Sequence, residues 1–232
     1  MMFLAVTSIT LFVVTSHSLE WIPILRRDPS DAADVNFARD LADFEEPFGN
    51  REGSFWAGLT EIHKRINRQL TGPAQLRVVL GGCDGTIAEA YYDRFVVGNR
   101  STGYQLRVGG YNPFVSTAGD SLTVDINGGV LNLDGQRFSA RDVDADSQEQ
   151  QNCAQLFNGA WWFNNCGMSS LLGEHKGDHC SQGGLVEGIV WASWRGPFYS
   201  ARYAVVEIGI EDHAIVLIGG VASGALSLKG PR

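Results

Sequence analysis

Apolar residues recur with regular spacing in several short segments of the chain, and these segments predict most of its regular structure. Residues 56–70 are the best helix candidate, because Ile62 and Ile66 lie four positions apart on one face and Thr60 is placed to cap the first turn. Other apolar or alternating runs predict an extended segment and four strands, at residues 20–25, 76–80, 91–97, 104–108 and 204–210.

The middle of the chain breaks this pattern. Residues 109–152 are rich in glycine and aspartate and show little periodicity. An irregular stretch of this length inside a compact domain is usually functional or stabilised by a ligand. We therefore expect the chemistry of the protein to lie at or near this stretch.

The two ends of the chain differ from the rest. Residues 1–18 carry no acidic or basic side chain, and Ser16 and Ser18 supply small residues at the positions expected before a cleavage site. We predict a secretory signal peptide there and a secreted, extracellular protein, with a buried N-terminal strand or helix as the alternative. Residues 211–232 form a C-terminal tail for which the sequence indicates no function. Neither apolar run reaches the roughly 20 residues that a membrane span needs.

Composition fits one compact domain between these ends. The 232 residues are 44% hydrophobic, which is enough apolar material for a sizeable core. The net charge of −8 argues against non-specific binding to nucleic acid. Secretion would permit disulfide bonds, and it makes Asn99-Arg100-Ser101 a candidate acceptor for N-glycosylation at Asn99.

The densest chemistry lies in residues 142–166, which read DVDADSQEQQNCAQLFNGAWWFNNC. Three alternating aspartates supply hard oxygen donors that suit Ca²⁺. Two cysteines thirteen positions apart can close a small loop, and an adjacent Trp161-Trp162 pair supplies a large apolar surface to pack against it. These features together predict a metal-binding, disulfide-closed loop in a secreted domain.

Further motifs follow one another along the chain: Phe48-Gly49-Asn50, Phe55-Trp56-Ala57-Gly58, Tyr91-Tyr92-Asp93-Arg94-Phe95, Thr117-Ala118-Gly119-Asp120-Ser121-Leu122, Asn152-Cys153-Ala154, Gly159-Ala160-Trp161-Trp162-Phe163 and Gly188-Ile189-Val190-Trp191. This ordered set resembles the fibrinogen-like (fibrinogen C-terminal) domain family. The resemblance implies an α+β fold over residues 19–210, with a twisted mixed or antiparallel sheet, few short helices and a long loop-rich calcium and ligand region. It also implies a non-enzymatic recognition domain. Members of the family normally begin with an upstream strand pair and its disulfide, which this chain is expected to lack.

The resemblance also implies a set of calcium ligands. Asp144 and Asp146 would give carboxylates, and Gln148 and Gln150 would give backbone carbonyls. The chain departs from the family here, because a one-residue insertion follows and offers Gln151 as an alternative second carbonyl. Backbone ligands tolerate a change of side chain, so we expect the site to persist. The alternative is an acidic, solvated loop.

The four cysteines fall into two pairs. Cys153 and Cys166 match the family's disulfide in spacing and in flanking residues. Cys83 and Cys180 match no family cysteine, so they either bond to each other or stay free. A zinc site is a remote alternative, formed by Cys180 with its nearby histidines His175 and His179, but it lacks a second Cys-x-x-Cys arm.

The ligand pocket is where this chain departs most from the family. The positions that build the pocket in relatives carry mainly apolar residues and a glycine, namely Leu156, Phe157, Gly167, Leu185 and Val186, which argues against recognition of a fibrin knob peptide. We expect the pocket to be lined by Trp162, Asn164, Asn165, Cys166 and Leu185, with a cis peptide bond between Asn165 and Cys166 as the resemblance implies. Trp161 is expected to belong to the core.

Three functions follow from these observations. The first is a lectin-like protein of the innate-immune type that binds glycans or acetylated ligands. The second is an extracellular matrix or receptor-binding protein that engages a protein partner. The third, which is remote, is an esterase, because Gly119-Asp120-Ser121-Leu122 spells the GDSL signature. No Asp-x-x-His accompanies that signature, so Ser121 lacks the base that a nucleophile requires. The oligomeric state does not follow from the sequence.

Overall fold

The computed structural model describes residues 9–30, 35–68, 72–125, 128–174, 176, 180 and 188–221. The chain divides into two units, Glu20–Ile210 and a smaller one made of Met1–Leu19 with Glu211–Arg232. Strands β1 (Ile9–Arg27) and β9 (Tyr203–Val221) have residues in both units. Everything described below belongs to the larger unit.

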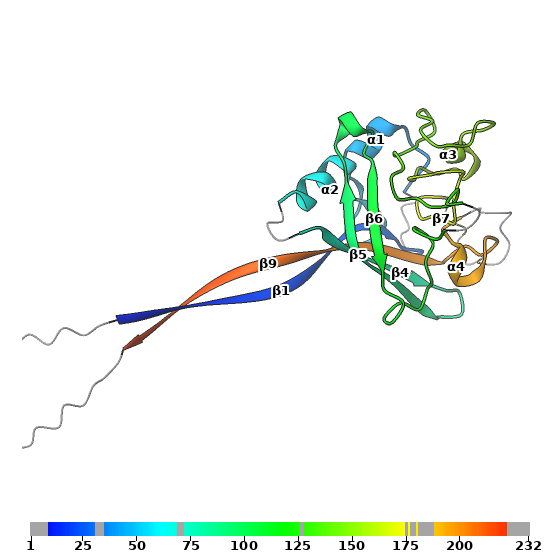
Figure 1. The fold of residues 1–232 in the computed structure, drawn as a ribbon. Coiled ribbons are helices and arrows are strands. Elements are labelled where there is room, and N and C mark those ends of the chain that lie inside the picture. Colours follow the sequence, from blue (N-terminus) through cyan, green and yellow to red (C-terminus); the bar gives the residue numbers. More distant parts are fainter. Residues whose placement is uncertain are drawn as a thin grey trace, which may run out of the picture. The chain divides into compact units, whose positions relative to one another are not determined.

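A seven-stranded sheet forms the centre of this unit, in the order β2-β3-β1-β9-β4-β5-β6. The further strands are β2 (Phe48–Gly49), β3 (Phe55–Trp56), β4 (Ala74–Gly81), β5 (Ile87–Val97) and β6 (Leu106–Tyr111). Every strand pairing of known register is antiparallel. A second sheet pairs only β7 (Ser169–Ser170) with β8 (Val190–Trp191). Figure 1 shows β5 between β4 and β6 in the large sheet.

Strand β4 shows why these segments are extended. Leu76, Val78 and Leu80 are buried on one face, whereas Arg77 and Val79 point to the other and are partly exposed. Alternation with a period of two is the signature of a strand that packs one face on a core. The expected strands at residues 76–80 and 91–97 are confirmed within the longer strands β4 and β5.

The first strand after β5 starts later than the sequence predicts. Tyr104 was expected to begin it, but Gly103 and Tyr104 both have positive φ angles, of 67° and 53°, and form a turn. The strand β6 therefore starts at Leu106. After Tyr111 the described residues contain no helix and no named strand before Cys153, as the lack of periodicity predicts.

The helices are few and short, as expected for this fold class: α1 (Leu41–Glu45), α2 (Leu59–Ile66), α3 (Cys153–Leu156), α4 (Ala192–Arg195) and the 3₁₀ helix η1 (Arg100–Thr102). The predicted helix at residues 56–70 is realised as α2, where Ile62 and Ile66 are buried. The prediction that Thr60 caps this helix is wrong. The N-cap is Gly58, at a φ of 86°, and a Cβ at that position would lie 2.7 Å from the Glu46 carbonyl carbon. Only glycine fits so close an approach of two backbone segments.

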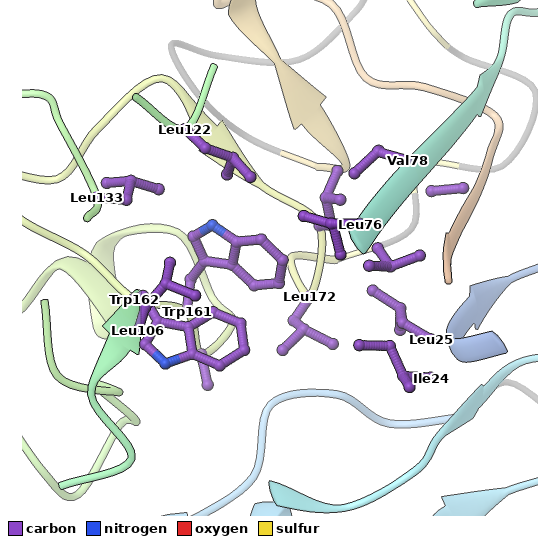
Figure 2. Close-up of a cluster of buried hydrophobic side chains, with 14 of the residues drawn as sticks. Ile24, Leu25, Leu76, Val78, Leu106, Leu122, Leu133, Trp161, Trp162 and Leu172 are labelled. Carbon is purple, nitrogen blue, oxygen red and sulfur yellow. The ribbon is translucent and has the colours of Figure 1, made fainter. Parts of the chain in front are cut away.

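The two adjacent tryptophans join the irregular segment to the sheet. Figure 2 shows Trp161 and Trp162 among apolar side chains from the sheet and from the loops, including Ile24, Leu25, Leu76, Leu106, Leu122, Leu133 and Leu172. Their ring centroids are 5.1 Å apart, and Trp161 and Trp162 are 4% and 2% exposed. Burial of Trp161 in the core confirms the expectation for that residue.

Candidate functional site

Asp146 is the best-positioned carboxylate of the acidic loop. Its Oδ1 accepts the backbone N–H of Gln148 at 2.9 Å, and its Oδ2 accepts that of Cys153 at 2.9 Å. Asp144 lies beside it, since Asp144 Oδ1 accepts the backbone N–H of Asp146 at 3.4 Å. The loop thus brings two carboxylates together at the start of helix α3, as the alternating aspartates predict.

The two carboxylates oppose each other's ionisation. Burial raises the pKa of Asp146, and the nearby Asp144 carboxylate raises it further, whereas the backbone N–H groups of Cys153 and Gln148 act in the opposite direction. Two carboxylates at close range repel each other when both are ionised, and a divalent cation between them would remove that repulsion. Each oxygen that accepts one hydrogen bond keeps a further lone pair for a metal.

The donor set fits calcium only if backbone and water oxygens complete it. Among the described residues, no group of three or more His, Cys, Asp or Glu side chains is placed to hold a metal ion. Calcium takes six to eight oxygens and accepts carbonyls and waters readily. The carbonyls of Gln148 and Gln150, with Gln151 as the alternative, remain the predicted additional ligands.

Two side-chain hydrogen bonds tie the acidic loop to the end of the disulfide loop. Ser147 Oγ donates to Asn164 Oδ1 at 2.5 Å, and Gln148 Nε2 donates to Asn165 Oδ1 at 2.8 Å. The disulfide Cys153–Cys166 closes the same loop, with its Cα atoms 5.3 Å apart. This pairing agrees with the one that the family resemblance implies. The acidic loop and the disulfide loop therefore form one cross-linked unit.

The expected pocket-lining role of Trp162 is wrong. Trp162 is buried, its Nε1 donates to the Tyr104 carbonyl at 2.8 Å, and its ring packs edge-on against Phe138 at 5.0 Å. An indole whose N–H is satisfied and whose ring is enclosed has no group to offer a ligand. Phe157 is likewise buried, and it packs against Phe163 at 5.0 Å.

The other expected pocket residues behave differently from one another. The Asn164 amide donates to the Gly129 and Asn132 carbonyls, so it holds the irregular segment in place. Asn165 is exposed, and Cys166 adopts a φ of 51°. The expectation of a cis Asn165–Cys166 bond is wrong, because the described residues contain no cis peptide and the left-handed turn at Cys166 supplies the change of direction instead.

Two of the expected pocket positions, Leu185 and Val186, lie outside the described residues. The structure therefore brings together Asn164, Asn165 and Cys166 beside the acidic loop, and it removes Trp162 from that group. The pocket-lining role expected for Leu185 stays a prediction.

The second cysteine pair is also a disulfide. Cys83 bonds to Cys180, with Cα atoms 6.0 Å apart. The alternative in which both stay free is therefore wrong, and so is the zinc alternative through Cys180, because its sulfur is committed to the disulfide. His175 and His179, the other residues of that alternative, lie outside the described residues.

The serine of the GDSL sequence is structural. Ser121 is fully buried, its Oγ lies 2.6 Å from Ser193 Oγ, and it accepts the backbone N–H of Ser193 at 3.0 Å. Asp120 accepts the Tyr92 hydroxyl at 2.7 Å and the backbone N–H of Leu122 at 2.9 Å. This segment fastens the irregular region to helix α4 and strand β5.

Asn99 lies at the surface, where an oligosaccharide transferase could reach it. It is exposed, it precedes the 3₁₀ helix η1, and its Oδ1 accepts the Ser101 hydroxyl at 2.6 Å. Glycosylation of Asn99 stays a prediction.

Sequence reasoning missed one polar cluster, formed by the dipeptides Arg39-Asp40 and Arg141-Asp142. Arg141 Nε donates to Asp40 Oδ1, and Asp142 Oδ1 accepts the backbone N–H of Leu41 at 2.8 Å. The only signal was the repeated dipeptide, at residues 39–40 and 141–142. A repeat of two residues a hundred positions apart indicates no contact until the fold is known.

Comparison with known proteins agrees with this geometry. A family model described as "Fibrinogen beta and gamma chains, C-terminal globular domain" matches residues 10–210. The chain is 36% identical over 194 residues to tenascin-R of Gallus gallus, covering 83% of this chain and 12% of that protein. This and other curated relatives are thus much longer than the chain.

Solved structures share the fold. The fibrinogen-like globe domain of human ANGPTL6 aligns with a TM-score of 0.70 at 33% identity, covering 81% of this chain and 77% of that one. A lamprey fibrin D-dimer complexed with the peptide Gly-His-Arg-Pro-amide aligns with a TM-score of 0.72 at 25% identity, covering 82% and 61%. The α+β architecture expected from the sequence is therefore confirmed.

Proposed function

Because the chain belongs to the family of fibrinogen β and γ C-terminal globular domains, we propose that it is a secreted recognition domain whose binding loops are stabilised by calcium. Domains of this family are non-enzymatic, which agrees with the buried, hydrogen-bonded state of Ser121. No helix in the described ranges is long and apolar enough to cross a membrane. The predicted signal peptide and the two disulfides support an oxidising, extracellular location.

The carboxylate pair of Asp144 and Asp146 is the observation that carries the calcium part of the proposal. Asp146 also holds the backbone of Cys153, so a cation that orders this carboxylate would order the start of the disulfide loop. When bound, calcium would neutralise the two carboxylates and fix the loop through oxygen ligands. Asp144 and Asp146 would hold it, with carbonyls from Gln148 and Gln150.

We place ligand recognition beside this loop and favour a glycan or an acetylated ligand. Asn165 is exposed, and its amide is oriented by the hydrogen bond from Gln148. Exposed amides that are held in place recognise hydroxyl and acetamido groups, because they both donate and accept hydrogen bonds.

A protein partner is the second candidate, and one surface feature favours it. Phe114 is 96% exposed and Val115 is 55% exposed, although the loop that carries them is anchored. Asn112 Oδ1 accepts the backbone N–H of Phe114, and the backbone carbonyl of Glu89 accepts that of Thr117 at 2.7 Å. A fixed, projecting aromatic side chain is a common anchor at protein interfaces.

Binding of the purified chain to an array of neutral, acetylated and sulfated saccharides, with calcium and with a chelator, tests the two candidates. Calcium-dependent binding that free N-acetylated sugars compete away supports the lectin-like function. An array without signal, together with a protein partner whose binding is lost in Phe114→Ala, supports the second candidate and rejects the first. Binding that is equal with calcium and with chelator contradicts the proposed role of calcium.

A further inference from the structure

A cavity of about 430 Å³ opens beside helix α3, and it is built from groups other than Asn165 and the carboxylate pair. We call it the Arg-Asp cavity. Its polar lining comes from three separate parts of the chain, namely Arg39 and Asp40, Arg141 and Asp142, and Gln155 and Asn158. Its volume lies within the range of about 300–1,000 Å³ that is usual for small-ligand sites.

The charged groups of this cavity balance in number, since Arg39 and Arg141 are positive and Asp40 and Asp142 are negative. Arg141 pairs with Asp40, and Asp142 accepts the backbone N–H of Leu41. Arg39 donates to the Asn36 carbonyl at 2.6 Å, and its guanidinium lies 4.3 Å from the centroid of the Phe48 ring. A strongly charged ligand would therefore meet groups of its own sign as well as groups of the opposite sign. A neutral ligand with hydroxyl groups would not, since a hydroxyl can donate to a carboxylate and accept from a guanidinium at the same time.

The rest of the lining presents amides and small side chains. Gln155 Nε2 donates to the Arg141 carbonyl at 2.8 Å, which leaves the Gln155 oxygen as an acceptor. Asn158 is exposed and holds a φ of 48°. Ala154 and Ala160 also line the cavity, and their small side chains leave room beside the two amides.

A separate hollow adjoins the cavity at Asn158. A second hollow of about 240 Å³ shares Ala38 and Asn158 with the first and is lined further by Arg27 and Glu174. Ala38 and Asn158 therefore stand at the junction of two adjoining spaces. A ligand of more than one ring could occupy both.

We propose that the Arg-Asp cavity binds a neutral, hydroxyl-rich saccharide, at a subsite separate from the one beside Asn165. The proposal rests on the glycan-binding function proposed above. Gln155 and Asn158 would bind hydroxyl groups directly, and the Asp40–Arg141 pair would bind them without losing its own contact.

Two variants test the site without removing its framework. Asn158→Gly deletes the amide and keeps a residue that accepts the positive φ, and Gln155→Ala deletes the amide of α3. Asn165→Gly removes an exposed asparagine amide at the other subsite and reports on that subsite separately. Asn67→Ala, at an exposed asparagine that follows helix α2 and lies outside both subsites, is the matched control. Thermal melting of each variant shows whether the fold is retained.

The saccharide array is first read with the wild type, and affinities are then measured by calorimetry with the strongest neutral saccharide and its sulfated form. We expect Asn158→Gly to weaken binding of the neutral saccharide about tenfold, with Gln155→Ala similar and the control Asn67→Ala close to the wild type. Neutral-saccharide binding that is lost in Asn165→Gly and kept in Asn158→Gly overturns this subsite and leaves the proposed glycan function standing. Preference for the sulfated form overturns the assignment of a neutral ligand. An array with no signal for any saccharide overturns both proposals.

Discussion

Asp146 Oδ2 accepts the backbone N–H of Cys153 at 2.9 Å, so one carboxylate of the predicted calcium site holds the first residue of the disulfide loop. The same carboxylate holds Gln148 through its other oxygen. Gln148 in turn donates to Asn165, close to the second cysteine of that loop. A cation that fixes the Asp146 carboxylate would therefore also order both ends of the disulfide loop through these hydrogen bonds.

The first prediction is that calcium raises the melting temperature of the wild type and that Asp146→Asn abolishes most of this rise. Calcium that binds only the folded state at a hundredfold excess over its dissociation constant stabilises by about 2.7 kcal/mol. The measurement is thermal melting with millimolar calcium or with a chelator.

Glu149→Gln is the matched control, because it removes the same charge from the same exposed loop at a position outside the predicted ligand set. It should keep most of the calcium-dependent rise. If Glu149→Gln and Asp146→Asn lose the calcium-dependent rise equally, the rise reflects the total charge of the loop and not a specific calcium site.

Local patterns in the sequence were enough to predict the parts of the fold that depend on short-range order. Strand β4 could be predicted because Leu76, Val78 and Leu80 alternate with more polar positions. The cap of α2 could not, because Gly58 is required by the approach of Glu46, which comes from a turn before the helix. Propensity favours a hydroxyl side chain as a cap, and here the close packing of two backbones overrides it.

The candidate site likewise has features that local sequence patterns predict and features that depend on the whole fold. Asp144 and Asp146 could be predicted to act together because residues two apart in an extended segment face the same side. Whether Trp162 lines a pocket depends on the surroundings of its ring, and these include Tyr104 and Phe138 from other parts of the chain. The pairing of Arg141 with Asp40 depends on the fold in the same way.

The second prediction concerns the two disulfides. Replacing Cys83 and Cys180 together by alanine should destabilise the domain more than replacing Cys153 and Cys166, because the first pair closes a loop with a sequence separation of 97 and the second one of 13. In the chain-entropy model the costs are about 4.7 and about 3 kcal/mol. Urea unfolding of the two double variants measures both. The opposite order would show that packing around Cys153, and not loop length, dominates.

The third prediction is that Trp162 stabilises the core and does not contact a ligand. Trp162→Ala should cost about 3–5 kcal/mol, because it removes a fully packed core ring. Trp162→Phe keeps an aromatic ring but leaves the Tyr104 carbonyl without its donor, so it should cost about 1–3 kcal/mol. Leu156→Ala, at a position 49% exposed, is the control and should change stability by no more than about 0.5 kcal/mol. A folded, stable Trp162→Ala protein that has lost only ligand binding would contradict the core assignment.

The fourth prediction is that Ser121 is structural. Ser121→Ala leaves the backbone N–H of Ser193 without its acceptor, so unfolding in urea should show a loss of about 1–3 kcal/mol. Hydrolysis of a p-nitrophenyl ester should be the same for the wild type and for this variant. Esterase activity that disappears with the Ser121 hydroxyl would instead make this serine a nucleophile.

The last prediction follows from Asp84 in the β4–β5 turn. The Thr86 hydroxyl, at 2.7 Å, and the Arg195 guanidinium, also at 2.7 Å, hold the pKa of the Asp84 carboxyl well below its usual range. A carboxyl whose pKa is lower in the folded than in the unfolded state stabilises the fold fully above the unfolded value of about 3.9. That contribution is lost as the pH falls toward the folded pKa.

Asp84→Asn should therefore be less stable than the wild type at pH 7 and should lose less stability on acidification below about pH 4. Arg195→Gln should make this acid-induced loss smaller and complete it at a higher pH than in the wild type, because the carboxyl then loses one of the groups that favour its ionised form. Melting temperatures measured from pH 7 down to strongly acidic solution check both effects, and parallel acid profiles for the wild type and Asp84→Asn would show that this turn contributes nothing to the pH dependence.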